Sequence, residues 1–279
     1  MARVLVYDSF DDLRSRDIRF LQEASRIGEV DALLWSDAAV RRITGSSPRF
    51  HEAERLYLIQ SLRYVRSASL TGESIDPETP PEGSFPRAEA WATTEELDSP
   101  RRRGEAKSRG LDYRVIAAKD LAGFPVVSAP AGQKAAGARG AASARTALVT
   151  GCFDWFHSGH VRFFEEASEL GTLYVVVGND ANLRLLKGEG HPFFSQEERR
   201  YQAASVRFVA QALVATGKGW LDAEPEIRAL KPDIYVVNED GDKPEKREFC
   251  ADNGIQYVVL HRAPRPGLPQ RTSTDLRGF

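Results

Sequence analysis

Cysteine and long apolar runs are both scarce in this chain of 279 residues. Its two cysteines, Cys152 and Cys250, cannot form a framework of disulfide bonds, and cysteine and histidine do not cluster as a structural zinc site requires. Apolar runs such as residues 173–177 are far shorter than the roughly 18 residues of a membrane-spanning helix. The N-terminus leads directly into strand-like and then acidic sequence, without the apolar segment of a signal peptide. We therefore expect a cytoplasmic protein in a reducing compartment, with no membrane partner.

An excess of charge of one sign is also missing. The chain has 38 Lys and Arg against 40 Asp and Glu, a formal net charge of −2. This balance argues against a protein that binds nucleic acid or anionic lipid through its overall charge, so any anion must meet a local site. With 42% hydrophobic and 28% charged residues, the composition is typical of a globular protein, and the length predicts about two domains of roughly 150 residues each.

An internal repeat divides the sequence into two halves. Phe10-Asp11 corresponds to Phe153-Asp154, an offset of 143 residues, and at this offset residues 19–20, 23–25 and 28 are identical to residues 162–163, 166–168 and 171. After one inserted residue the offset becomes 144, and identities continue from Pro48 and Pro192 to Tyr113 and Tyr257. Identities that persist over a domain length with a single-residue gap indicate a duplicated domain.

A stretch of small residues separates the two halves. Residues 128–145 are rich in Ala and Gly and have no apolar period, which is typical of a flexible connector. The sequence therefore predicts a first domain over residues 1–127, a linker over 128–145 and a second domain over 146–279.

The second half alternates short apolar runs with amphipathic segments. The run 147–150 precedes apolar residues at helical spacing over 161–170 and then the buried run 173–177, the pattern of a βαβ unit. Ser195 and Glu198 have the spacing of a capping box that opens another helix, and residues 212–215, 234–237 and 256–260 are further strand candidates. The pattern predicts an α/β fold with a Rossmann-like, doubly wound parallel sheet and a ligand at the carboxyl ends of its strands. Because the first half repeats the pattern, we expect two tandem domains of this fold.

One segment of the second half carries residues suited to a phosphate site. Residues 151–160 read GCFDWFHSGH and stand between the first strand and the helix that follows. Unsatisfied N–H groups and the positive end of the helix favour an anion at such a turn. Gly151 permits close approach of a phosphate, Gly159 keeps the first helical turn open, and His157 and His160 share one helix face. The turn therefore predicts a site for a phosphoryl group.

This segment resembles the cytidylyltransferase branch of the nucleotidyltransferase superfamily, whose pattern G-x-F-D-x-x-H-x-G-H is matched at every fixed position. Lys187-Gly188 stands where the family carries a phosphate-binding lysine, and Arg199 lies in a helix that resembles the family's E-R-x-x-x pattern. The segment Arg271-Thr272-Ser273-Thr274 is similar to the family's R-T-x-G-I-S-T-S segment without its x-G-I part.

The resemblance implies an enzyme that transfers a nucleotidyl group, with CMP from CTP as the leading expectation, to a small phosphorylated alcohol or sugar with release of pyrophosphate. It implies that His157 and His160 stabilise the phosphoryl group under attack and that Lys187 contacts the triphosphate. It also implies Mg²⁺ that bridges phosphate oxygens without a protein cage. The family positions expected at the nucleotide are Gly151, Phe153, Asp154, Gly159, Arg199, Arg271, Ser273 and Thr274. For Asp154 we expect hydrogen bonds to the backbone that hold the loop.

The first half lacks this chemistry. Arg14-Ser15-Arg16-Asp17 stands in place of His157-Ser158-Gly159-His160, so both imidazoles and the glycine are missing. We expect a degenerate, non-catalytic copy that pairs with the second domain as an intrachain pseudo-dimer, and a homo-oligomer stays open. The layout resembles that of two-domain ethanolamine-phosphate cytidylyltransferases, with the active copy placed second rather than first.

Other functions stay open. An adenylyltransferase that uses ATP would share the His-x-Gly-His turn, and the departure in residues 271–274 also fits a nucleotide-binding regulatory protein without turnover. A class I aminoacyl-tRNA synthetase is disfavoured, because we find neither a K-M-S-K-S-like loop nor an anticodon domain nor a basic charge balance.

Overall fold

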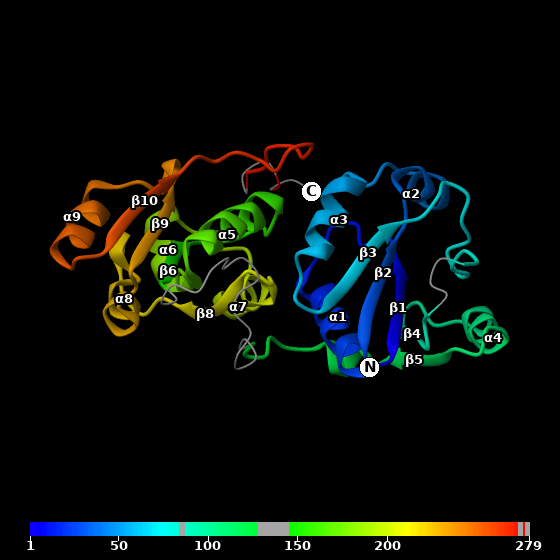
Figure 1. Cartoon of the computed structure of the whole chain (residues 1–279). Coiled ribbons are helices and arrows are strands. Elements are labelled where there is room, and N and C mark those ends of the chain that lie inside the picture. Colours follow the sequence, from blue (N-terminus) through cyan, green and yellow to red (C-terminus); the bar gives the residue numbers. More distant parts are fainter. Residues whose placement is uncertain (84–86, 128–144, 273–275, 277–279) are drawn as a thin grey trace. The chain divides into compact units, whose positions relative to one another are not determined.

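The computed structural model describes residues 1–83, 87–127, 145–272 and 276, which form two compact units (Figure 1). We call Met1–Gly123 the first unit and Phe124–Phe279 the second unit. Phe124 belongs to the second unit because its carbonyl accepts a hydrogen bond of 3.1 Å from Nη2 of Arg200 and its ring lies beside that of Tyr201. The expected linker lies outside the described residues except for Arg145.

The two units repeat the same order of strands and helices. The first unit contains β1 (Arg3–Asp8), α1 (Ser15–Ile27), β2 (Glu29–Leu34), α2 (Asp37–Thr44), α3 (Glu52–Gln60), β3 (Val65–Leu70), β4 (Ala90–Thr94), α4 (Pro100–Ser108), β5 (Asp112–Ile116) and the short 3₁₀ helix η1 (Ala118–Leu121). The second unit contains β6 (Thr146–Gly151), α5 (Ser158–Leu170), β7 (Thr172–Val177), α6 (Asp180–Lys187), α7 (Gln196–Ser205), β8 (Val209–Val214), η2 (Gly219–Leu221), α8 (Glu224–Leu230), β9 (Ile234–Asn238), η3 (Glu239–Gly241), α9 (Pro244–Asp252) and β10 (Gln256–Leu260).

Both sheets are parallel and have the same topology. The strand order is β3-β2-β1-β4-β5 in the first unit and β10-β9-β6-β7-β8 in the second, which is one order because β6 to β10 correspond to β1 to β5. Even the irregularities repeat, since the register shifts between Val30 and Asp31 in the first sheet and between Leu173 and Tyr174 in the second. The predicted fold of two tandem doubly wound domains is therefore confirmed.

Several helices begin at a capping side chain. The Ser195 hydroxyl accepts a hydrogen bond from the backbone N–H of Glu198 at the start of α7, as its spacing predicts. Ser36 and Asn179 cap α2 and α6 in the same way. On one face of the second sheet, Ile227 of α8 and Cys250 of α9 pack into the apolar core. None of the helices in the described ranges combines the length and apolar character that a membrane span needs.

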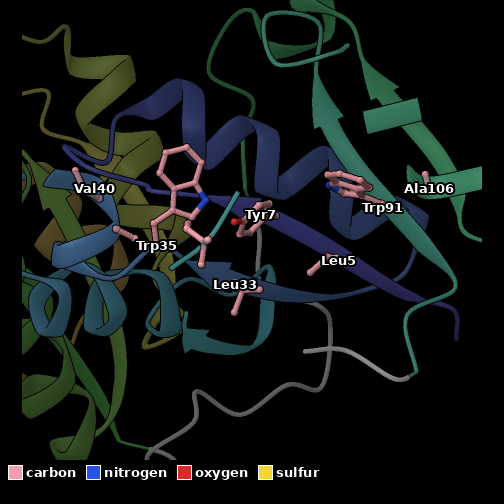
Figure 2. Packing of buried hydrophobic residues seen from close by; sticks show 9 residues of the cluster. Leu5, Tyr7, Leu33, Trp35, Val40, Trp91 and Ala106 are labelled. Carbon is pink, nitrogen blue, oxygen red and sulfur yellow. The ribbon is translucent and has the colours of Figure 1, made fainter. Parts of the chain in front are cut away.

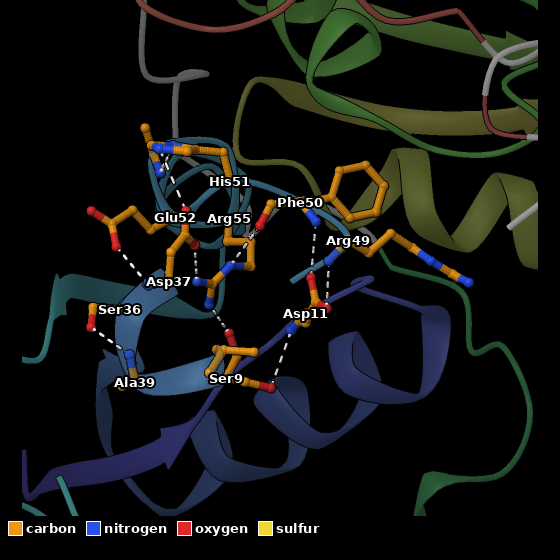
Figure 3. Close-up of polar contacts among 12 residues, drawn as sticks. Ser9, Asp11, Ser36, Asp37, Ala39, Arg49, Phe50, His51, Glu52 and Arg55 are labelled. Atoms are coloured by element: carbon orange, nitrogen blue, oxygen red, sulfur yellow. Dashed lines mark hydrogen bonds and ion pairs between the residues drawn. The ribbon is translucent and has the colours of Figure 1, made fainter. Parts of the chain in front are cut away.

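A polar network ties the loop after β1 to the rest of the first unit (Figure 3). The Asp11 carboxylate accepts hydrogen bonds from the backbone N–H groups of Arg49 (2.8 Å) and Phe50 (3.0 Å). The buried Arg55 guanidinium donates to the carbonyls of Phe50 and Ser9 and to the carboxylate of Asp37. This network recurs in the second unit, where it positions the candidate site.

Candidate active site

A cavity of about 430 Å³ opens at the carboxyl ends of the central strands of the second unit. It is lined by Thr150 and Gly151 at the end of β6, by Gly178 after β7, and by Val237 and Asn238 at the end of β9. The strand order reverses at β6, which lies between β7 and β9. Ligands of doubly wound sheets bind at such a switch point.

The loop between β6 and α5 has an unusual backbone and is tied down by Asp154. Phe153 and Trp155 each have a φ of 51°, in the left-handed region that L-residues seldom adopt. The Asp154 carboxylate accepts hydrogen bonds from the backbone N–H groups of Phe193 (2.9 Å) and Phe194 (3.1 Å). Asp154 therefore shapes the loop, while Phe153 lines the cavity with its ring edge against His160.

His157 and His160 are stacked but have different surroundings. Their ring centroids are 3.8 Å apart and their planes differ by 24°. His157 is fully buried at the N-cap of α5, where its Nδ1 accepts a hydrogen bond from the Gly159 backbone N–H at 3.0 Å. A neutral His157 ring therefore carries its proton on Nε2. His160 lines the cavity, and its buried Nδ1 has no hydrogen-bond partner among the described residues. Of the two imidazoles, His160 is the one placed to meet a ligand.

Gly159 makes this arrangement possible. A Cβ atom at this position would lie 2.9 Å from Cε1 of His157 and 3.6 Å from the carbonyl oxygen of Arg271. A side chain would displace the His157 ring from the stack. The glycine also lines the cavity, so the backbone at the start of α5 is open to a ligand.

The charges around His160 suit a phosphate. Burial lowers the pKa of His160 well below its usual range, and electrostatic interactions with His157, Arg262 and Lys187 lower it further. His160 is therefore neutral at pH 7 and can donate a hydrogen bond through one ring nitrogen. Lys187, at the end of α6, and Arg262, after β10, line the same cavity. A neutral imidazole flanked by two cationic side chains can bind a phosphoryl oxygen without a proton transfer.

Arg199 lies behind the cavity rather than in its lining. It is fully buried, and its guanidinium donates to the carbonyls of Phe194 (3.0 Å), Cys152 (2.6 Å) and Gly178 (2.7 Å) and to the Asp180 carboxylate (2.8 Å). These contacts match those of Arg55 in the first unit. Arg199 thus joins the motif loop, the end of β7 and the start of α6.

The C-terminal segment approaches the start of α5. The Arg271 carbonyl accepts a hydrogen bond of 3.0 Å from Nη2 of Arg262, and Thr272 lines the cavity. Arg271 itself is not one of the residues that line this cavity. Ser273 and Thr274, which were also expected at the nucleotide, lie outside the described residues.

Several cavity residues lie outside every sequence motif. Trp220, Asp222, Lys246 and Arg262 all line the cavity, but none belongs to a motif. They follow β8, β9 and β10, and parallel strands bring their carboxyl ends to one edge of the sheet. The strand pattern could therefore have indicated these loops, although not which side chain of each loop faces the ligand.

At the corresponding place, the first unit carries a buried tryptophan within an apolar cluster (Figure 2). Trp35 stands at the position of Gly178 and is 7% exposed. Its ring contacts that of Tyr7 edge to face at 5.9 Å, within an apolar cluster that includes Leu33, Val40 and Trp91. A Cβ atom at Gly178 would lie 3.2 Å from Oδ2 of Asp222, which lines the cavity. A side chain at this position therefore points into the space that the second unit keeps open.

The chain is similar to proteins of one family. The family model described as cytidylyltransferase-like matches residues 148–264. FAD synthase from Aciduliprofundum boonei is 34% identical over 134 residues, which are 47% of this chain and 83% of that protein. FAD synthase from Methanospirillum hungatei is 30% identical over 132 residues, 46% of this chain and 81% of that protein. The bifunctional protein HldE from Campylobacter concisus is 35% identical over 97 residues, 34% of this chain, and the chain spans only 20% of the length of that protein.

Proposed function

Because the chain belongs to the cytidylyltransferase-like family of nucleotidyltransferases, we propose that its second unit transfers a nucleotidyl group from a nucleoside triphosphate to a small phosphorylated acceptor. The observation that carries the proposal is the placement of His160, Lys187 and Arg262 in one cavity at the start of α5. These groups surround the point where a helix N-terminus attracts a phosphate.

The reaction needs positioning and charge neutralisation rather than a covalent enzyme intermediate. An oxygen of the acceptor phosphate forms a bond to the α-phosphorus, and the bond from that phosphorus to the oxygen bridging to the β-phosphate breaks. Pyrophosphate leaves with the electron pair of the broken bond. His160 donates a hydrogen bond to an α-phosphoryl oxygen, and Lys187 and Arg262 hold the negative charge of the triphosphate.

Magnesium would be held by the substrate. Within the described ranges, no group of three or more His, Cys, Asp or Glu side chains is placed to hold a metal ion. We therefore assign Mg²⁺ to the triphosphate oxygens, where it would supply further charge neutralisation. No residue of this chain is assigned as its ligand.

For the donor we favour ATP over CTP. The chain covers 83% of an FAD synthase, and FAD is an adenine dinucleotide. CTP is the second candidate because the motif at residues 151–160 and the matching family model are both of the cytidylyltransferase type. In either case the first unit is proposed to be non-catalytic, since it lacks the imidazoles and its corresponding space is filled by Trp35.

A thermal-shift series with ATP, CTP, GTP and UTP in the presence of Mg²⁺ separates these donors. A ligand at about 100 times its Kd stabilises the folded protein by about 2.7 kcal/mol, so the preferred triphosphate should raise the melting temperature most. Release of pyrophosphate is then measured with that triphosphate and a panel of phosphorylated acceptors. Binding without release across the panel would favour the regulatory alternative, and no binding of any triphosphate would refute the proposal.

A further inference from the structure

A second lysine of the cavity is half-buried and has few polar partners. Lys246 lies in the first turn of α9 and lines the cavity. Its Nζ donates one long hydrogen bond, of 3.3 Å, to the Gly241 carbonyl, and no carboxylate of the described residues lies within ion-pair distance. Burial is also the largest cause of the lowered pKa of its ammonium group. Nζ also lies 5.7 Å from the centroid of the Tyr235 ring. The half-buried ammonium thus has one long hydrogen bond and one ring contact, and its remaining N–H groups can donate to the oxygens of a ligand.

The first unit shows what such a cation requires. Arg102 of α4 corresponds to Lys246 of α9 at the repeat offset, and Arg102 is buried with polar protein partners. It donates to the hydroxyl of Thr93 (3.1 Å) and the carbonyl of Pro77 (2.7 Å). The position of Thr93 is taken by Val237 in the second unit, which offers no hydroxyl. The second unit has thus kept the cation and replaced its hydroxyl partner with an apolar side chain beside an open cavity.

The carboxylates near Lys246 are already engaged. Asp240 pairs with Arg262, and Asp242 pairs with Arg247. Asp222 accepts a hydrogen bond of 3.1 Å from the Asn182 side chain, and burial raises its pKa. None of these groups neutralises Lys246 by direct contact.

Lys246 and His160 have different charged neighbours. The charges that act on His160 are those of His157, Arg262 and Lys187, whereas those that act on Lys246 are Asp222, Lys243, Asp240 and Asp242. Near Lys246 the cavity is also lined by the exposed Trp220, and the Lys243 ammonium lies 5.2 Å from the centroid of the Trp220 ring. Two ammonium groups therefore lie here, among the carboxylates of Asp222, Asp240 and Asp242, and both can donate hydrogen bonds to the oxygens of a ligand.

We propose that Lys246 binds an oxygen-rich part of the acceptor, at the end remote from the phosphate that attacks. The acceptors are then phosphate esters of polyhydroxylated or carboxylate-bearing molecules rather than of amino alcohols, because the ammonium group of an amino alcohol cannot accept a hydrogen bond from Lys246. This inference rests on the proposed function and adds a substrate class to it.

The test measures binding in the complete chain by calorimetry. Flavin mononucleotide and glycerol 3-phosphate serve as oxygen-rich probes and phosphocholine as the cationic probe, each titrated in the presence of α,β-methylene ATP or its cytidine counterpart. The variants are Lys246→Met, which removes the charge at similar volume, and Lys246→Arg, which keeps it. Lys231→Met, at the exposed end of α8, is the control for loss of one charge outside the cavity.

In the unmodified chain, an oxygen-rich probe should bind and phosphocholine should not. Lys246→Met should weaken the binding of that probe about 10-fold or more, the loss typical of one hydrogen bond to a charged group. Lys246→Arg should restore most of it, and Lys231→Met should change nothing. The Kd of the triphosphate analogue should be the same in all variants.

Each other result is decisive. If neither triphosphate analogue binds, the proposed function itself fails. If an analogue binds but no oxygen-rich probe does, or phosphocholine binds more tightly, or Lys246→Met leaves the probe Kd unchanged, the assignment of Lys246 is wrong while the proposed function stands.

Discussion

His157 and His160, three residues apart, are side chains of the same type in two different environments. His157 makes its contact within the protein: its Nδ1 caps α5, and its ring is fully buried. His160 lies one helical turn further and borders the cavity. Since the rings are stacked, the buried imidazole fixes the orientation of the one that borders the cavity. We therefore propose His157 as the support and His160 as the ligand contact.

His160→Ala should lower kcat by at least about 100-fold while the Kd of the triphosphate changes much less. The reason is that the loss of a donor placed for the transition state costs on the order of 2.7 to 4 kcal/mol. The measurement combines pyrophosphate release with calorimetric binding of the triphosphate. An unchanged kcat would remove His160 from the reaction, and an equal loss in kcat and binding would make it a ground-state contact.

His160 should also stay neutral through the pH range in which an ordinary imidazole, with a pKa of about 6.5, takes up its proton. Its pKa is lowered in the folded protein, so the unfolded chain binds this proton first as the pH falls. The stability linked to this residue is therefore fully present above about pH 6.5 and is lost below it. Heteronuclear NMR titration of the ligand-free chain, with His160→Asn for assignment, should show no inflection of this ring near pH 6.5. An ordinary titration there would contradict the burial of the ring.

At the scale of elements, the two units are built around the same buried arginine. Arg55 and Arg199 each bind the loop after the first strand and the helix that follows the second strand. The loop cannot take its left-handed conformation independently of these segments, because its carbonyls are the acceptors of the guanidinium. The network therefore sets the position of the start of α5, and through it the position of His160.

Arg199→Met should destabilise the second unit by about 3 kcal/mol, because it removes one partner from a buried charged network. Triphosphate binding should weaken as well, since the motif loop loses its support. Arg55→Met is the matched control: it removes the same network from the first unit and should destabilise that unit to a similar extent without any change in the triphosphate Kd. Urea unfolding and calorimetric titration of both variants provide the measurement. If Arg199→Met abolished binding with unchanged stability, the arginine would contact the nucleotide directly, as its family position implies.

The elements themselves were largely predictable from the sequence, because local patterns determine them. The cap at Ser195 and the runs at residues 173–177 and 234–237 lie in the elements expected of them. The strand predicted over 212–215 in fact spans Val209–Val214, since period and composition locate a strand better than its ends. The residues of the site were harder to predict than the elements. The motif identifies His160. The residue spacing does not predict that Arg199 points inward or that Lys246 lines the cavity, because the direction of each side chain depends on contacts between segments distant in sequence.

At the scale of the whole molecule, the duplication has kept the framework and divided the chemistry. The loop conformation, the buried arginine and the strand order are shared by both units, whereas the two differ in what fills the switch point. In the second unit Gly178 leaves the space open, and in the first unit Trp35 occupies it with its ring against Tyr7. A site can be lost in this way without cost to the fold, because an indole buried in the former cleft adds to the apolar core.

Each chain should therefore bind one triphosphate, and a single exchange at this position should decide where. Gly178→Trp places in the second unit the side chain that fills the first, so the calorimetric stoichiometry should fall from one triphosphate per chain to none. The circular dichroism spectrum should be retained, because the first unit carries the same residue at the same point of the same fold. Trp35→Gly is the reciprocal control. It should destabilise the first unit by about 3 to 5 kcal/mol, as the loss of a buried tryptophan does. It should leave the stoichiometry at one triphosphate per chain, because the first unit lacks the two histidines of the motif. Two triphosphates per chain before any substitution, or binding that survives in Gly178→Trp, would show that the open switch point of the second unit is not the nucleotide site.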